Sequence, residues 1–449
     1  MIWLFAIVAT PLFVLIAIVL WVALHIRPKP PVERFATVTA TVVDQAEDLH
    51  LHGSSIAYLP NGRLGCVWFK GTGERNRPDV HLCFSQSDDG EHWDKPVVIH
   101  NTPGQADINP VLWIDNDKLT VFFHRIANKT WASAVAAQID AIWADDQWQW
   151  QSATDLNLVF DPDYPEQFKQ RFWQNFRLLW PASFSTPWVI GRRRHEQEIR
   201  LNLDRSLMRR PLSLAIGWFA KHFAQHQADV CSGKHDAAPY WLYPKHSHPI
   251  TLQDGWQTRY SPLVCQGKVL LPLYSDHLGY SQIFERCDDG SWKAQPPLTA
   301  MLAIQPTLVD VENKLVCLMR NNGFPPKRIL SAESSDAGQT WSPVMATSLP
   351  SPATAADAIA WRDTALCVYN DSETDRRCLA LGWYSGGHWQ PLKRLLSHPS
   401  ESYGYPAMAK DNSDNVYISF TNPTANSGRI CCLKLSAPSI ERWLAQDRE

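Results

Sequence analysis

Short apolar runs come in pairs along this chain, and each pair is joined by a polar turn such as Asn-Gly, Gln-Gly or Ser-Asp. Runs rich in β-branched and aromatic residues around such a turn are typical of a β-hairpin. Six pairs occur, at residues 54–69, 109–123, 260–274, 305–320, 353–370 and 405–421. Apart from one longer step they repeat about every 50 residues, the period of a four-stranded propeller blade. The pattern predicts an all-β fold, a six-bladed β-propeller over residues 36–449, with residues 35–43 as an outer strand that closes the ring.

The longer step lies between the second and third pairs and predicts an insertion over residues 143–255. Within it, residues 161–180 and 205–226 carry apolar residues at helical spacing, with basic residues between them. One face of the first segment carries the phenylalanines Phe168, Phe172 and Phe176. Three interpretations stay open for this helical insertion: a subdomain packed on the propeller, an element over residues 160–226 that lies on a membrane surface, or a lid.

The chain begins with an apolar segment that contains no charged residue from Ile2 to Leu24. At about 1.5 Å per residue such a helix spans a bilayer core of about 30 Å. A cleavable signal peptide would have a shorter apolar run and a small-residue cleavage site. We therefore expect an uncleaved N-terminal transmembrane helix as an anchor, residues 1–27, followed by a stiff linker, residues 28–35.

The charge balance argues against a nucleic-acid partner, because 42 Lys and Arg face 45 Asp and Glu, for a formal net charge of −3. Motifs for bound cofactors are also missing: there is no P-loop, no G-x-G-x-x-G after a strand and no C-x-x-C. The insertion holds His235, Asp236 and a His-Ser-His string at 246–248, which are metal-ligating residue types, but with sixteen histidines in the chain chance proximity is the simpler explanation. We expect no cofactor and no metal.

A second repeated motif is the box S-x-D-x-G-x-x-W, which is complete at residues 334–341. Residues 85–93 keep Asp88, Gly90 and Trp93, with the serine one position out of register. Shortened versions occur at residues 286–292 and 384–389. In such a turn the Asp side chain caps backbone N–H groups, Gly takes the positive φ and Trp fills the space between strands. The boxes are markers of the fold rather than catalytic residues.

The boxes, their spacing and the strings HGSSIAYLPNG, INPVLW, LLPLYSD, AIQPTLV and GYPAM resemble the bacterial sialidase-like (neuraminidase-like, BNR-repeat) proteins. That family has a six-bladed β-propeller. The resemblance covers roughly residues 50–145 and 256–435, and it leaves out the anchor and the insertion. It implies a glycan-directed function, and its fold implication agrees with the hairpin pattern.

The topology of a blade brings the start of its first strand and the end of its second strand to one face of the ring, opposite the box turns. Arginine, carboxylate and amide side chains gather there, which suits an anionic or heavily hydroxylated sugar. The wider set includes Arg75, Asn109, Tyr260 and Arg376. The expected substrate-binding residues are Arg259, Asp276, Gln305, Arg320, Asn370, Arg377 and Arg429.

Sialidase chemistry uses three arginines for the substrate carboxylate, an aspartate as acid/base and a tyrosine paired with a glutamate as nucleophile. The resemblance implies Asp79 as the acid/base and Tyr405 as the tyrosine, with Glu74 or Asp276 as its partner. Arg320 and Arg377 are the implied carboxylate clamps, with Arg259 or Arg429 as further candidates. The first clamp arginine of sialidases comes from an R-I-P string, where this chain has HGSSI. Either another arginine replaces it, or the substrate is not a sialic acid.

Two functions follow from these residues. The first is a membrane-anchored exo-glycosidase of sialidase type that acts on acidic glycans. The second is a non-catalytic propeller that binds a polysaccharide or acts as a scaffold in envelope glycan assembly. Arg27, Lys29 and Arg34 favour the cytoplasm for the flank of the anchor, whereas a glycan substrate favours the periplasm. We expect a single-pass protein of the bacterial inner membrane, with the propeller in the periplasm and its orientation open.

Overall fold

The structure, a computed structural model, describes residues 26–28, 38–127, 129–185, 188–193, 197–201, 218, 221, 254–276, 279–298, 300, 302–322, 326–423 and 427–448. The expected anchor (1–27) and linker (28–35) lie outside these residues except for a short strand at 26–28. The helical segment 205–226, apart from two residues, and the histidines at 235–248 lie outside them as well. In the described part of the chain, no helix combines the length and apolar character that crossing a membrane requires.

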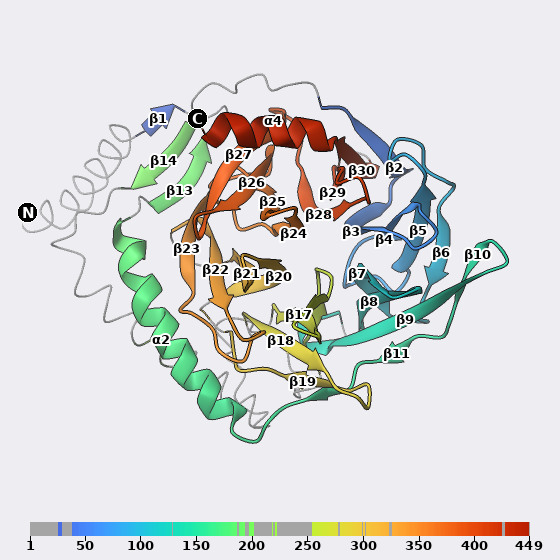
Figure 1. The fold of residues 1–449 in the computed structure, drawn as a ribbon, viewed down its shortest axis with the longest axis horizontal. Helices are drawn as coiled ribbons and strands as arrows, with labels where there is room; N and C mark the ends of the chain where they lie inside the picture. The colour runs from blue at the N-terminus through green and yellow to red at the C-terminus, as the bar shows by residue number, and fades with distance from the viewer. Residues whose placement is uncertain are drawn as a thin grey trace, which may run out of the picture.

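Six sheets surround a central axis, so the predicted six-bladed propeller is confirmed (Figure 1). Blade 1 contains β3 (His50–Tyr58), β4 (Leu64–Gly71), β5 (His81–Ser87) and β6 (Val97–His100). Blade 2 contains β7 (Ala106–Asp115), β8 (Lys118–Ile126), β9 (Ala134–Ala144) and β10 (Gln147–Trp150), with β11 (Thr154–Asp155) paired to β9. Blade 3 contains β15 (Gln257–Thr258), β16 (Leu263–Cys265), β17 (Lys268–Ser275), β18 (Tyr280–Arg286), β19 (Trp292–Ala294) and β12 (Leu158–Val159).

The other three blades follow the same plan. Blade 4 contains β20 (Ala303–Val311), β21 (Lys314–Asn321), β22 (Arg328–Ser334) and β23 (Met345–Pro350). Blade 5 contains β24 (Asp357–Trp361), β25 (Thr364–Asn370), β26 (Cys378–Ser385) and β27 (His388–Ser397). Blade 6 contains β28 (Gly404–Lys410), β29 (Val416–Thr421), β30 (Ser427–Leu435) and β2 (Ala40–Glu47). Each of the six predicted hairpins supplies inner strands of one blade.

Neighbouring blades cover both faces of the inner strands. The strand β25 is buried along its whole length. Between blades 1 and 2, Phe69 and Phe84 belong to the same buried cluster as Val121 and Phe123. Because both faces are covered, these strands read in the sequence as continuous apolar runs rather than as a strict alternation.

The ring is closed by β2, which pairs antiparallel with β30, so the start of the propeller lies beside its end. The expected closing strand is confirmed, although it occupies residues 40–47 rather than 35–43. The Asp44 carboxylate accepts hydrogen bonds from Trp68 Nε1 at 3.2 Å and from Lys70 Nζ at 3.0 Å. Both donors lie on β4, so this carboxylate joins the closing strand to blade 1.

The chain leaves the propeller after β12 rather than at residue 143, because β10, β11 and β12 still pair within blades 2 and 3. The first predicted helical segment is confirmed as α2 (Tyr164–Ser185), which lies along the outer rim of the ring (Figure 1). Its phenylalanines Phe168, Phe172 and Phe176 are buried in the cluster of blade 3. For α2, the packed subdomain is therefore the correct interpretation.

The remaining elements lie around the ring. A separate three-stranded sheet contains β1 (Ile26–Pro28), β14 (Gln197–Leu201) and β13 (Trp188–Arg193). A 3-10 turn, η1 (Trp131–Ser133), precedes β9, and the C-terminal helix α4 (Ala437–Arg448) packs through Ile440 and Leu444 on blades 5 and 6.

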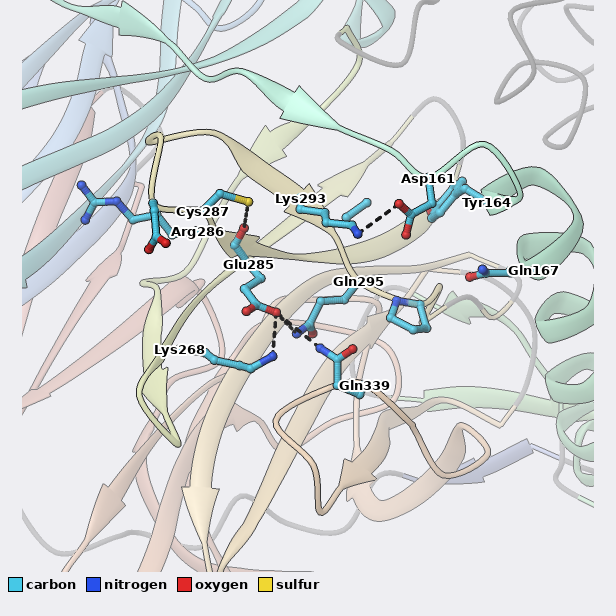
Figure 2. Close-up of a pocket in the computed structure, with 13 residues that line it drawn as sticks. Asp161, Tyr164, Gln167, Lys268, Glu285, Arg286, Cys287, Lys293, Gln295 and Gln339 are labelled. Carbon is cyan, nitrogen blue, oxygen red and sulfur yellow. Dashed lines mark hydrogen bonds and ion pairs between the residues drawn. The ribbon is translucent and has the colours of Figure 1, made fainter.

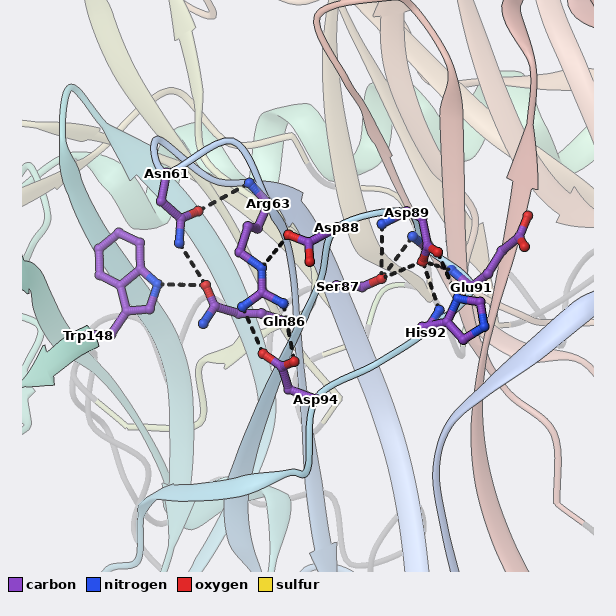
Figure 3. A network of polar contacts seen from close by, with 11 residues as sticks. Asn61, Arg63, Gln86, Ser87, Asp88, Asp89, Glu91, His92, Asp94 and Trp148 are labelled. Carbon is purple, nitrogen blue, oxygen red and sulfur yellow. Dashed lines mark hydrogen bonds and ion pairs between the residues drawn. The ribbon is translucent and has the colours of Figure 1, made fainter. Parts of the chain in front are cut away.

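The Asp boxes form turns as predicted, with one correction. In the complete box, Ser334 Oγ accepts the Gly338 N–H at 2.8 Å. In the first box the corresponding acceptor for the Gly90 N–H is Ser87 Oγ at 2.8 Å, and the capping carboxylate is Asp89 (Figure 3). The expected box residue Asp88 is wrong, because it forms an ion pair with Arg63 at 2.7 Å instead. This box lacks one residue between Asp and Gly, and its serine is in register.

Replacing Asp44 with Ala should lower the free energy of unfolding by about 2–3 kcal/mol. The substitution leaves the Lys70 ammonium and the Trp68 N–H without their acceptor in a site where the Asp44 side chain is only 9% exposed. Urea denaturation measures the effect, and Glu47→Ala, an exposed change on the same strand, is the control. Equal stability of the two variants would contradict this role of Asp44.

Candidate functional site

The first strands of four blades carry the same β-bulge where they approach the centre of the ring. A residue with positive φ stands in each bulge: Gly53 (64°), Asn109 (48°), Gln305 (53°) and Tyr405 (52°). The strand register shifts at each of these positions. A bulge re-aims the residue that it contains, and the left-handed conformation is strained for residues other than glycine. Three of the four bulges continue with a proline: Pro110, Pro306 and Pro406.

The bulge residues of blades 2 and 4 meet at Tyr274 of blade 3. The Tyr274 hydroxyl accepts hydrogen bonds from Asn109 Nδ2 and Gln305 Nε2, both at 3.3 Å. Gln305 in turn accepts a hydrogen bond from Arg320 Nη1 at 3.1 Å. Burial, with the nearby charge of Asp276 acting in the same direction, raises the pKa of the Tyr274 phenol well above its usual value. Tyr274 therefore acts as a neutral hydrogen-bonding centre for three blades.

Tyr405, the bulge residue of blade 6, is half-buried among cationic and aromatic groups. The guanidinium carbons of Arg259 and Arg376 each lie 5.2 Å from the centre of its ring. The ring of His52 in blade 1 stands edge-on to it, with 4.3 Å between centroids. Burial, followed by the charges of His50 and the two arginines, lowers the pKa of His52 well below its usual value, so this imidazole is neutral.

Arg259 lies beneath Tyr405 and has no exposed surface. Its guanidinium donates hydrogen bonds to the carbonyl oxygens of Ser54 at 3.1 Å, Tyr405 at 2.6 Å and Pro406 at 3.3 Å. It therefore fastens blade 3 to blades 1 and 6 and fixes the backbone of the bulge. Arg259 therefore positions Tyr405. The Arg259 N–H groups donate to backbone carbonyls rather than pointing to a place where a substrate would bind.

Two carboxyl groups, Glu74 and Asp276, lie near the arginines of this site. Burial, together with the charge of Asp276, raises the pKa of Glu74, although Arg75 and Arg376 oppose the shift. Burial also raises the pKa of Asp276, against the opposing charges of Arg320 and Arg75. Carboxyl groups that stay protonated closer to neutral pH suit general acid/base chemistry. The Tyr405 hydroxyl itself has no hydrogen bond within the part of the chain that the structure describes.

Asp79 is placed differently. It is exposed and accepts hydrogen bonds from the backbone N–H and the hydroxyl of Thr72, both at 2.8 Å. Desolvation opposes the shift, but these hydrogen bonds lower the pKa of Asp79 below its usual value. The Asp79 carboxylate therefore stays ionised and braces its own loop.

Comparison with known proteins supports the expected resemblance. A family model described as a BNR repeat-like domain matches residues 234–418. No curated protein matches the chain. Among solved structures, a protein of unknown function from Dyadobacter fermentans aligns with a TM-score of 0.57 at 13% identity, covering 92% of this chain and 99% of that one.

Two sialidases share the fold of this chain. Trypanosoma rangeli sialidase aligns with a TM-score of 0.55 at 12% identity, covering 94% of this chain and 61% of its own. The Hadza microbial sialidase aligns with a TM-score of 0.55 at 12% identity, covering 87% and 66%. The alignment thus spans less than two thirds of either sialidase, and at this identity it establishes the fold. The expected resemblance to BNR-repeat proteins is thus confirmed for residues 234–418, and the expected sialidase-like propeller fold is confirmed as well.

Within this propeller, five of the expected residues come together around the central axis of the ring, in what we call the channel site: Glu74, Asp276, Gln305, Arg320 and Tyr405. Three others hold nearby loops. Arg377 pairs with Asp375 at 3.3 Å, while its neighbour Arg376 faces Tyr405. Asn370 is buried and donates a hydrogen bond to the Tyr403 carbonyl at 2.8 Å. Arg429 donates to the Asn422 carbonyl at 3.3 Å.

Sequence reasoning missed His52 and Tyr274, and it placed Arg75, Asn109 and Arg376 on the right face without selecting them. Comparing the bulge strings His-Gly-Ser, Ile-Asn-Pro, Ile-Gln-Pro and Gly-Tyr-Pro with one another could have found His52, because it replaces an apolar or small residue. The orientation of Arg376 relative to Arg377 depends on the loop after β25 and leaves no sequence signal. In the described ranges, no group of three or more His, Cys, Asp or Glu side chains is placed to hold a metal ion.

Replacing Arg259 with Lys should lower the free energy of unfolding by about 2–4 kcal/mol, because one ammonium leaves two of the three buried carbonyls unpaired. Arg429→Lys, which changes a half-buried arginine with one backbone hydrogen bond, should cost about 1 kcal/mol or less. Chemical denaturation of both variants makes the comparison. A loss no larger for Arg259→Lys than for Arg429→Lys would show that Arg259 does not fasten the blades.

Proposed function

We propose that this protein is a membrane-anchored, sialidase-like glycoside hydrolase that acts on acidic glycans. The observation that carries the proposal is the position of Tyr405. This tyrosine occupies a strained bulge at the channel, between the guanidinium groups of Arg259 and Arg376. Strained backbone and clustered charges at one point are typical of catalytic centres.

Arginines from three blades would bind the substrate. Arg75, Arg320 and Arg376 come from blades 1, 4 and 5, and all three contribute to the electrostatic environment of the carboxyl groups there. A guanidinium recognises a carboxylate or another planar anion through paired N–H groups. We assign these three residues as the anion-binding set, in place of the Arg320 and Arg377 pair that the resemblance suggests.

The reaction would divide into two displacements. The Tyr405 oxygen would attack the anomeric carbon as the glycosidic bond breaks. One of Glu74 and Asp276, in its protonated form, would give its proton to the leaving oxygen, and the other, in its ionised form, would take the proton of the Tyr405 phenol. Water would then displace the tyrosine oxygen: the first carboxylate would take a proton from the water, and the second carboxyl group would return its proton to the tyrosine. A tyrosine suits a sugar that carries a carboxylate at its anomeric carbon, because a neutral phenol avoids charge repulsion. Glu74 and Asp276 replace Asp79 in the acid/base role because of their raised pKa values.

A non-catalytic glycan-binding or scaffold function is the second candidate. It is favoured by the Tyr405 hydroxyl, which has no hydrogen bond to a carboxylate among the described residues. It is also favoured by the neutral, half-buried His52 in the bulge of blade 1, where the sialidase resemblance requires an arginine. In both candidates the apolar segment Ile2–Leu24 would anchor the chain in a bacterial inner membrane, with the propeller in the periplasm.

Replacing Tyr405 with Phe should abolish turnover, since it removes the nucleophilic oxygen while keeping the ring that Arg376 contacts. Purified protein would be screened with aryl glycosides of sialic acid, other acidic sugars and neutral sugars. Tyr384→Phe is the matched control, because its hydroxyl binds Glu333 at 2.8 Å on blade 4. Unchanged turnover in Tyr405→Phe would exclude this nucleophile, and no turnover of any glycoside or polymer would favour the binding function.

The pH dependence of kcat/KM should reflect the carboxyl group that gives up its proton. Its raised pKa keeps the acid protonated above the usual value of 4.5 for Glu or 3.8 for Asp, so the rate should fall as pH rises through the higher value. Glu74→Gln or Asp276→Asn, whichever removes this alkaline limb, identifies the acid. Asp79→Asn should keep the alkaline limb of the kcat/KM profile. If Asp79→Asn loses this limb, the acid role belongs to Asp79.

A further inference from the structure

A polar groove runs between α2 and the face of blades 3 and 4 that carries the Asp-box turns. It consists of two compartments of about 480 Å³ and 300 Å³, which share Gln167 and Pro296. Lys268 lines the groove at the start of β17, whereas Asp276 of the candidate site follows the end of that strand. The groove therefore lies at the opposite end of the blade from Tyr405 and is separate from the channel.

One wall of the groove is a stripe of amide side chains on α2. Gln167, Gln170 and Gln174 are spaced i, i+3 and i+7, so they share one face of the helix. A different face of α2 carries the buried phenylalanines that pack against blade 3. Arg171 donates to the Trp341 carbonyl at 2.7 Å, which holds this wall at a fixed distance from blade 4. The amides are thus presented on a rigid element.

The floor of the larger compartment is a network around Glu285 (Figure 2). One oxygen, Glu285 Oε2, accepts hydrogen bonds from Lys268 Nζ at 2.9 Å and from Gln295 Nε2 and Gln339 Nε2 at 3.3 Å. Three donors from separate strands and turns therefore fix this carboxylate. Within the described residues none of these hydrogen bonds uses Oε1, which leaves a pre-positioned acceptor.

Most charges of the groove are paired. Lys268 pairs with Glu285 at 2.9 Å, and Lys293 pairs with Asp161 at 3.1 Å at the mouth. Arg286 pairs with Asp115 at 3.0 Å, Arg171 donates to the Trp341 carbonyl, and Asp288 is the third carboxylate of the lining. The other oxygen and nitrogen groups are amides and hydroxyls, which both donate and accept hydrogen bonds. Such a lining suits an uncharged ligand with many hydroxyl groups. Half-buried Pro296 adds some apolar surface where the two compartments meet.

We infer that the α2 groove binds a neutral saccharide chain of at least two sugar units. Two compartments in series match consecutive rings, and the glutamine stripe runs along the line that the chain would follow. The channel site, with Arg75, Arg320 and Arg376, selects anionic groups. The inference does not depend on hydrolysis at Tyr405, because it concerns binding on the other face.

The test is a binding measurement on the full chain by isothermal titration calorimetry, in a detergent without a sugar headgroup. The probes are maltoheptaose, cellohexaose and chitohexaose, with polysialic acid as the anionic comparison. Gln170→Ala combined with Gln174→Ala should raise the Kd of the bound neutral probe about tenfold through the loss of two amide partners. Alanine favours helix, so this variant keeps α2.

Two controls make the outcome decisive. Glu166→Ala with Lys169→Ala changes the same helix outside the groove and should leave the Kd unchanged. Tyr405→Phe should also bind the neutral probe normally, which separates this site from the channel. The inference is overturned if no neutral probe binds at millimolar concentration, if the glutamine variant binds as tightly as the wild type, or if Tyr405→Phe loses the binding.

Discussion

Closure of the ring by β2 is the interaction on which the rest of the structure depends. The strand comes from the start of the propeller and pairs with β30 within blade 6, so backbone hydrogen bonds hold the start of the propeller in its last blade, directly before blade 1 begins at β3. Every blade then has two neighbours, and both faces of each inner strand are covered. The channel site requires this closure, because its side chains come from blades at opposite ends of the sequence.

Polar residues can occupy the centre of the ring because they form hydrogen bonds there, Arg259 with the backbone and Tyr274 with side chains of other blades. Arg259 is fully buried, yet its guanidinium meets three carbonyl oxygens of blades 1 and 6. Tyr274 performs a related task for blades 2 and 4 through neutral hydrogen bonds. A buried charge is tolerated when most of its donors are paired, and Arg259 Nε is the one guanidinium nitrogen here without a hydrogen-bond partner among the described residues. These two residues hold the bulges in their strained conformation, and the bulges in turn present Tyr405 to the channel.

The two faces of the ring have different chemistry. One face gathers arginines and carboxyl groups whose pKa values are raised by burial, and it is the natural place for the proposed cleavage of acidic glycans. The other face carries the Asp-box turns and, next to α2, a groove whose charges are mostly paired. Because the two faces lie at opposite ends of the same strands, a long glycan could contact them independently of one another.

The propeller, the blade number, the closing strand and the first inserted helix could be predicted from the sequence. Hydrophobic periodicity and turn residues are local, and they act over a few residues wherever the chain lies. The face of the site could also be predicted, since strand direction alone determines it. Which residues of that face form the candidate site could not be predicted. Arg376 rather than Arg377 faces Tyr405, and Arg259 is buried beneath Tyr405. Glu74 and Asp276 have raised pKa values, whereas the pKa of Asp79 is lowered. Burial, hydrogen-bond partners and neighbouring charges decide these differences, and they exist only once the six blades have closed around the channel.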